Sequence, residues 1–175
     1  MKKIRQSFIW IALILMAFSA PLNAQISKAE IIATGLTCSM CSNAIIKQLS
    51  AMSEVDSVTT DLNTNTFVVY LKKNNVLQPK LLKQRVEKAG FFIGSLVLTM
   101  SFDNLKIDNN LVVKKGENTL IFVDTKARTL TGETKVKVLD KGYITLKEHK
   151  KMMKSFSKIP SYATENEEDY HLKAL

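Results

Sequence analysis

The order of strand and helix patterns between residues 29 and 98 restricts the possible folds more than any other feature of this chain. Apolar residues follow strand spacing in four segments, namely residues 29–35, 55–62, 67–71 and 91–98. Between them, helical spacing links two other sets, Cys41, Ile45, Leu49 and Met52, then Pro79, Leu82, Val86 and Ala89. The order is strand, helix, strand, strand, helix, strand. It predicts an α+β fold of the ferredoxin-like βαββαβ sandwich class.

The only two cysteines form one C-x-x-C, Cys38 and Cys41, between the first predicted strand and the first predicted helix. Two thiolates at this spacing can hold one ion, and soft sulfur ligands favour Cu(I). A structural zinc site would need four ligands. A helix N-terminus favours anionic sulfur, so it lowers the thiol pKa and eases metal binding. Cys38 and Cys41 are therefore the predicted metal ligands.

Two other uses of the C-x-x-C stay open from the residues alone. A disulfide between Cys38 and Cys41 would close a very short loop and stabilise the chain little. A thiol-disulfide oxidoreductase also carries a C-x-x-C at a helix N-terminus. Such enzymes have a proline facing the disulfide, whereas the prolines beyond residue 24 are Pro79, at a helix start, and Pro160, near the C-terminus. We therefore expect a binding module and not an enzyme.

Two runs of residues carry a family resemblance. Gly35-x-Thr37-Cys38-x-x-Cys41 and Lys88-Ala89-Gly90-Phe91, in this order of elements, resemble the heavy-metal-associated domain of copper chaperones, metal-pumping ATPase tails and periplasmic mercury-binding proteins. The resemblance covers residues 28–98, within a predicted domain 28–100. It implies that Cys38 and Cys41 bind Cu(I), or another soft ion such as Hg(II). An exposed two-coordinate ion can accept a third ligand from a partner, so we expect transfer by ligand exchange to a metal-transporting membrane protein or another metal acceptor or donor.

Three further positions near the loop follow from the same resemblance. Leu36 stands where the family has methionine, and leucine fills a similar volume, so we expect the loop to keep its shape. Met40 is either a third, thioether ligand or an exposed contact for a partner. Phe91 and Phe92 lie where the family places an aromatic or a lysine, so we expect one in the core and one shielding the thiolates. Met40 and Phe91 are thus possible accessory residues.

Residues 1–24 have the pattern of a secretory signal peptide. Lys2, Lys3 and Arg5 precede an apolar run over residues 8–20, and Ala24 suits cleavage before Gln25. The run is shorter than the roughly 20 residues of a membrane-spanning helix. An uncleaved signal anchor is the alternative. We expect an exported, periplasmic or otherwise extracytoplasmic protein with no stable membrane span in the mature chain.

The positive charge of the chain does not by itself require a nucleic-acid partner. The chain has 25 Lys and Arg against 16 Asp and Glu, and three of the basic residues lie in the predicted signal peptide. Basic and aromatic residues are not interleaved in the way that stacks on bases, so no nucleic-acid partner is expected. The moderate excess favours solubility or weak contact with an anionic surface.

The sequence beyond residue 100 predicts a small β-rich C-terminal region. Short apolar runs predict a small β meander over residues 101–148, with strands at residues 111–113, 120–123, 136–139 and 143–146. Residues 149–175 are expected to form a short amphipathic helix and a flexible polar tail. The helical pattern covers residues 147–158, and the tail begins at Ser161. His149, Met152 and Met153 resemble a loose copper-ligand set, the alternative being packing on the meander. A metal-responsive interaction protein, acting through this region, is a further hypothesis.

Overall fold

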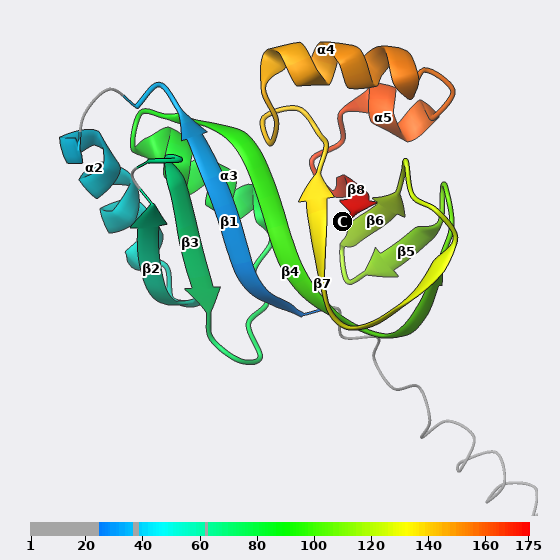
Figure 1. Ribbon diagram of the computed structural model, residues 1–175, viewed down its shortest axis with the longest axis horizontal. Helices are drawn as coiled ribbons and strands as arrows, with labels where there is room; N and C mark the ends of the chain where they lie inside the picture. The colour runs from blue at the N-terminus through cyan, green and yellow to red at the C-terminus, as the bar shows by residue number, and fades with distance from the viewer. Residues whose placement is uncertain (1–24, 37–38, 62) are drawn as a thin grey trace, which may run out of the picture.

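One mixed sheet contains all eight strands of the described chain, in the order β2-β3-β1-β4-β7-β8-β6-β5 (Figure 1). The computed structural model describes residues 25–36, 39–61 and 63–175. The predicted signal peptide lies outside these residues, as does Cys38. No helix within the described part of the chain has the length and apolar character to cross a membrane.

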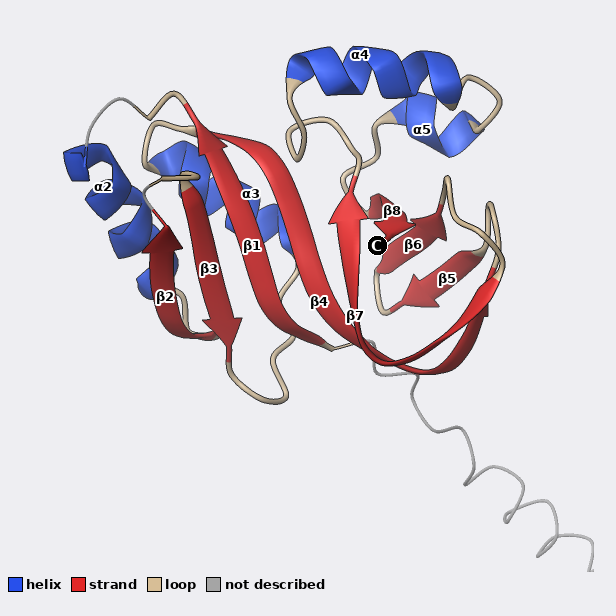
Figure 2. Cartoon of the chain, viewed as in Figure 1, coloured by secondary structure: helices blue, strands red, loops and turns tan. Residues whose placement is uncertain are grey.

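The N-terminal half, residues 25–100, has the predicted order of elements. Its elements are β1 (Ile26–Thr34), α2 (Ser39–Ser50), β2 (Val55–Asp61), β3 (Thr66–Leu71), α3 (Pro79–Lys88) and the first part of β4 (Phe92–Ile107). The strands are antiparallel in the order β2-β3-β1-β4, and α2 and α3 pack side by side (Figure 2). The ferredoxin-like α+β prediction is confirmed.

Apolar spacing and local backbone preferences explain the two helices. Ile45 and Leu49 on α2, and Leu82 and Val86 on α3, are fully buried, as their helical spacing predicts. Pro79 opens α3 where a first turn needs no N–H from it. After α3 the chain turns at Gly90, whose φ of 88° lies in the left-handed region that suits glycine.

The strand β4 belongs to both parts of the sheet and runs across residue 100, where the sequence predicts the end of the first domain. It runs for 16 residues, pairing with β1 over its first part and with β7 (Arg128–Val138) from Leu96 to Ile107. Its register shifts between Phe102 and Leu105, around Asn104, which has a φ of 49°. The two halves therefore share a continuous backbone ladder.

The C-terminal half, residues 101–175, is β-rich as predicted but is not a meander. Its other elements are β5 (Val112–Lys115), β6 (Asn118–Phe122), α4 (Leu146–Ser155), α5 (Pro160–Thr164) and β8 (Asp169–Ala174). β6 pairs with β8 in parallel, and β8 separates β6 from β7. The strand predicted at residues 143–146 is wrong, because Tyr143 lies in a turn and Ile144 makes only isolated bridges.

The polar tail predicted from Ser161 is also wrong. It contains α5 and β8, and three consecutive residues of β8 are buried, Tyr170, His171 and Leu172. Residues 165–168 of the acidic run form the exposed turn before β8. A strand with so short a buried run, preceded by charges, does not show the alternation that identifies strands in a sequence.

Both faces of the C-terminal half are covered. On β6, Leu120 and Phe122 enter the main core. Ile121 on the same strand and Val123 just after it form a second cluster with Leu139, Ile144 and Tyr162. The amphipathic helix is confirmed as α4, with Met152, Met153 and Phe156 packed against that second cluster. A strand covered on both faces has continuous apolar sequence, as residues 120–123 do.

Candidate metal site

The loop between β1 and α2 places Cys41 in the first turn of a helix. Cys41 is partly buried, one turn before the fully buried Ile45. Its sulfur lies at the positive end of the helix, where thiolate is favoured. Cys38, the other predicted ligand, lies outside the described residues, so the distance between the two sulfurs is not described either. Met40 is in the same first turn, but the direction of its side chain is not described.

The entry to this loop is shaped by Gly35 and Leu36. Gly35 has a φ of 86°, which a residue with a side chain adopts only at a cost. Leu36 is partly buried and packs against the main core. The loop therefore has an apolar anchor at the position where leucine replaces the methionine expected from the resemblance.

Phe91 and Phe92 have different environments. A Cβ built on Gly35 would lie 3.9 Å from Phe91 Cδ1, so this ring borders the start of the loop. Phe91 also packs against the main core, whereas the Phe92 side chain is 66% exposed. Phe92 pairs with Thr34, whose hydroxyl donates to the Phe92 carbonyl at 3.3 Å. Phe91 is thus the aromatic residue that borders the loop.

The C-terminal histidine and methionines lie among apolar and aromatic side chains. His149 is buried, with its ring 5.7 Å from that of Tyr162 and its Nε2 4.0 Å from Glu165 Oε1. Met152 and Met153 pack in the second cluster. Within the described ranges, no group of three or more His, Cys, Asp or Glu side chains is arranged to hold a metal ion. Packing accounts for these side chains.

Sequence reasoning missed a Ser-His-Asp contact in the C-terminal half. His171 Nδ1 lies 2.6 Å from Asp140 Oδ1, and Ser161 Oγ lies 2.9 Å from His171 Nε2. The His171 backbone N–H also donates to Asp140 Oδ2 at 2.7 Å. The three residues are not close together in the sequence, so no sequence motif identifies them.

This contact has the order of partners found in serine hydrolases, but not their access. The His171 side chain is 1% exposed, and its ring is edge-on to Tyr162 at 4.9 Å. A neighbouring cavity of about 350 Å³ is lined by Asp140 and Tyr162 but by neither Ser161 nor His171. We assign the three residues a structural role: they hold β8 and α5 against the end of β7.

Comparison with known proteins agrees with the site. A family model for the heavy-metal-associated domain matches residues 30–92. Residues 30–92 are a heavy-metal-associated domain. This domain includes both cysteines, the whole of α2 and the Gly90–Phe91 turn, and it covers a little over a third of the chain. The match supports binding of a heavy-metal ion. No curated protein sequence matches the chain.

Solved structures of such domains resemble this part of the chain. The yeast copper transporter domain Ccc2a, known in apo and Cu(I)-loaded states, is 31% identical, covering 37% of this chain and 88% of its own, with a TM-score of 0.34. A copper-binding domain from the P-type ATPase HMA7 is 29% identical, covering 38% and 88%, with a TM-score of 0.34. The apo domain of a copper chaperone for superoxide dismutase is 18% identical, covering 55% and 90%, with a TM-score of 0.35.

Proposed function

We propose that this protein is an exported carrier or buffer of a soft metal ion, foremost Cu(I), held by Cys38 and Cys41. The observation that carries the proposal is the position of the C-x-x-C: it joins β1 to α2 within a heavy-metal-associated domain. Hg(II) is the other ion that two thiolates at this spacing suit. In this proposal the protein is a binding module, not an enzyme.

The surroundings of Cys41 support binding of an anionic dithiolate. The helix N-terminus offers positive potential to the sulfur, and the Phe91 ring beside Gly35 limits water on one side of the loop. The first turn of α2 contains no acidic residue.

We further propose that the ion passes to an acceptor by ligand exchange, in which an acceptor thiolate binds the ion before the donor thiolates leave. Domains from a copper transporter and from a P-type ATPase are among the structures that resemble residues 30–92, so a metal-transporting membrane protein is the proposed partner. The pattern of residues 1–24 supports an extracytoplasmic location.

The first test is Cu(I) competition against a chromophoric chelator, using reduced protein from Gln25 onward. One tight equivalent is expected, and it should be lost in the Cys38→Ser, Cys41→Ser double variant. A matched control, Met152→Leu with Met153→Leu, should keep it, because these side chains pack in the second cluster. Tight binding that survives the cysteine changes and is lost in the control would move the site to the His149 segment. Absence of tight binding would favour dithiol redox chemistry, which insulin reduction would then measure.

Transfer is tested by mixing Cu(I)-loaded protein with a second thiol-containing acceptor domain. Ligand exchange predicts that the transfer rate rises with acceptor concentration, because both proteins contact the ion in the rate-limiting step. Release of free ion would give a rate independent of acceptor concentration and would contradict this part of the proposal.

A further inference from the structure

The helix α4 presents four lysines to solvent on one side. Lys147, Lys150, Lys151 and Lys154 have the spacing i, i+3, i+4, i+7, which places them on one face of the helix over roughly 10 Å. All four are exposed, and Lys158 follows in the next turn, exposed as well. We call the first four residues the lysine face of α4.

The opposite side of α4 is attached to the rest of the protein. Met152 and Met153 pack in the second cluster, and His149 is buried. At the start of the helix, the Thr145 hydroxyl accepts a hydrogen bond from the Glu148 backbone N–H at 3.2 Å. Figure 2 shows α4 as the outermost element at its end of the molecule. The direction of the lysine face is therefore fixed, and it points to solvent.

The charges of the lysine face are not neutralised within the described part of the chain. The one acidic residue of α4, Glu148, pairs with Lys137 at 2.6 Å. Glu165, from the acidic turn, pairs with Lys141 and approaches His149 on the other side of the helix. None of the ion pairs among the described residues includes a lysine of the face. Four ammonium groups on one side of a short helix create a positive potential that attracts an anionic partner.

The shape and chemistry of this face favour an extended anionic surface over a small anion. The neighbouring cavity of about 350 Å³ is lined by Leu146 and His149, but by no residue of the lysine face. Lysine is a point charge without the planar fork that holds one carboxylate or phosphate through two bonds. Leu146, next to Lys147, is 72% exposed. An exposed apolar side chain beside lysines suits a phospholipid surface better than a hydrated acidic protein or a nucleic acid.

We propose that the lysine face of α4 binds the surface of a bilayer that contains anionic phospholipids. The contact is electrostatic, Leu146 enters the head-group region, and α4 stays packed on the protein. Each lysine close to an anionic bilayer contributes about fivefold to binding, which is ~1 kcal/mol. Four lysines therefore give an attachment that is measurable and still reversible. This contact uses no cysteine, so it goes beyond the proposed metal function.

The start of α4 lies at the same end of the sheet as the metal loop (Figure 2). A Cβ built on Gly94 would lie 2.5 Å from Thr34 Cγ2 and 3.7 Å from Thr145 Cγ2. Thr34 ends β1 just before the loop, and Thr145 caps α4. A bilayer bound by α4 therefore lies at the end of the molecule that carries the cysteine loop. The use of this position to reach a membrane acceptor rests on the proposed function, whereas lipid binding itself does not.

The first test is sedimentation of the protein from Gln25 onward with large vesicles of phosphatidylcholine, alone or with about 30% phosphatidylglycerol. Binding is expected only to the anionic vesicles, and it should be lost at about 1 M NaCl, where the Debye length is ~3 Å. Equal binding to both kinds of vesicle would overturn the proposal. Tighter binding to polyglutamate than to anionic vesicles, at equal concentration of negative charge, would also overturn it, because an acidic protein would then be the better partner.

Two quadruple variants with the same change in net charge separate the lysine face from the overall charge. Replacing the four lysines of the face by glutamine, which is also a good helix former, should weaken vesicle binding at least fiftyfold. A control replaces four exposed lysines outside α4 that form no ion pair with a described residue, and it should weaken binding less than tenfold. The control variant is Lys73→Gln, Lys106→Gln, Lys114→Gln and Lys126→Gln. Equal losses would reduce the effect to net charge and overturn the proposal.

Further variants separate this contact from a loss of folding and from the metal site. Replacing the lysine face by arginine keeps the charge and should retain vesicle binding within threefold. Leu146→Ser should weaken binding to vesicles about threefold and leave binding to polyglutamate unchanged. The Cys38→Ser, Cys41→Ser variant should bind vesicles as the unchanged protein does, and the glutamine variant of the face should keep its equivalent of Cu(I). Loss of vesicle binding in the arginine or the cysteine variant would overturn the proposal.

Discussion

The two halves of the sheet are stabilised by different kinds of contact. In the N-terminal half, α2 and α3 cover the sheet with fully buried aliphatic side chains, such as Leu49 and Leu82. In the C-terminal half, buried polar contacts hold β8 and α5: Asp140 with His171 and Ser161, and the Tyr162 hydroxyl donating to the Leu139 carbonyl at 2.7 Å. In the N-terminal half, the free energy of unfolding should therefore depend mainly on the volume of the buried side chains. In the C-terminal half, it should depend mainly on the buried hydrogen bonds.

The largest expected effect is in the C-terminal half. His171→Leu keeps an apolar side chain of similar size but leaves the Asp140 carboxylate without its imidazole partner. Because removing one partner of a buried pair is strongly destabilising, we expect a loss of about 4 kcal/mol in the free energy of unfolding. Urea unfolding measures it.

An exposed ion pair of the same half gives the control for that experiment. Lys173 contacts Asp124 at the surface, and Lys173→Ala should cost less than about 1 kcal/mol. A cost for His171→Leu no larger than that of Lys173→Ala would show that the polar contact does not hold this half.

The corresponding change in the N-terminal half is Leu49→Ala. It removes a fully buried side chain from α2. We expect a loss of about 3 kcal/mol in the free energy of unfolding, because less apolar surface is buried and a cavity is left behind. Leu49→Met keeps the volume and should cost less than about 1.5 kcal/mol. The same urea transitions measure both variants. If methionine were as damaging as alanine, stability here would depend on exact shape and not on volume.

Alkaline pH should destabilise the protein through two tyrosines, Tyr143 and Tyr170. Burial raises the pKa of Tyr143 and of Tyr170, so both stay neutral in the folded state while the unfolded chain ionises near pH 10. The stability that the two neutral tyrosines contribute is fully present below pH 10. It is lost as the pH rises above 10, at up to about 1.4 kcal/mol per pH unit for each group. Tyr143→Phe should flatten the fall, measured as Tm against pH from 9 to 11. An unchanged slope would place the alkaline sensitivity elsewhere.

The smallest expected effect concerns one bond between the halves. The Lys80 backbone N–H at the start of α3 donates to the Tyr170 hydroxyl on β8 at 3.3 Å. Tyr170→Phe keeps the ring but removes this bond and the hydrogen bond that the hydroxyl shares with Tyr143, so we expect a loss of about 1 kcal/mol. Hydrogen exchange of the Lys80 amide should quicken while that of the α2 amides stays constant. Faster exchange in α2 as well would mean that the halves open together.

The N-terminal half could be predicted because its information is local. Residues four apart on α2 share one buried face, and Pro79 and Gly90 mark the limits of α3. The cysteine spacing was visible too, and with the order of elements it predicted a heavy-metal-associated domain. The position of the loop between β1 and α2 follows from that order alone.

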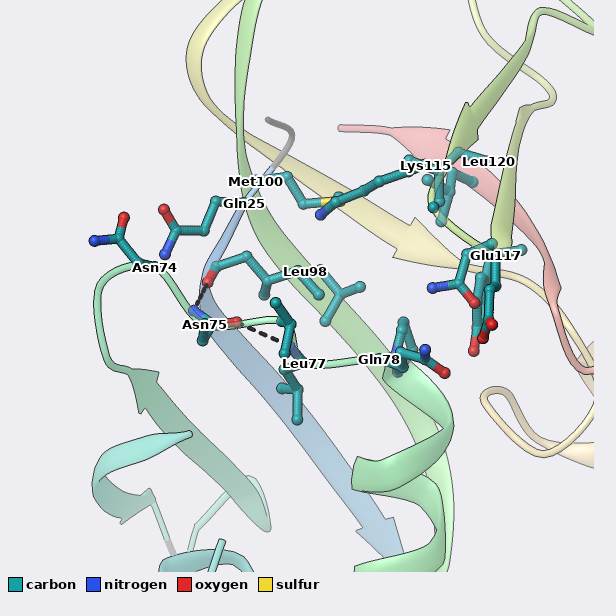
Figure 3. A pocket seen from close by; sticks show the side chains of 17 residues that line it. Gln25, Asn74, Asn75, Leu77, Gln78, Leu98, Met100, Lys115, Glu117 and Leu120 are labelled. Atoms are coloured by element: carbon teal, nitrogen blue, oxygen red, sulfur yellow. Dashed lines mark hydrogen bonds between the residues drawn. The ribbon is translucent and has the colours of Figure 1, made fainter. Parts of the chain in front are cut away.

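The C-terminal half could not be predicted to the same extent because its information is not local. β8 becomes a central strand by pairing in parallel with β6 and antiparallel with β7, and its short buried run looks polar in sequence. Asp140, Ser161 and His171 meet only after β7, α5 and β8 are in place. A cavity between the halves is lined by Lys115 and Asn75, which different halves supply (Figure 3). No sequence pattern connects such residues.

The strand β1 connects two distant parts of the molecule. Gln25 and Ile26, at its start, line the cavity between the two halves, and Thr34, at its end, leads into the loop that carries the cysteines. Nine residues of extended chain rise ~3.3 Å each, so the two regions lie roughly 27 Å apart along one rigid element. The strand therefore fixes the distance between the cysteine loop and the junction of the two halves. Dyes placed near the two ends of β1 would report the same separation with and without Cu(I).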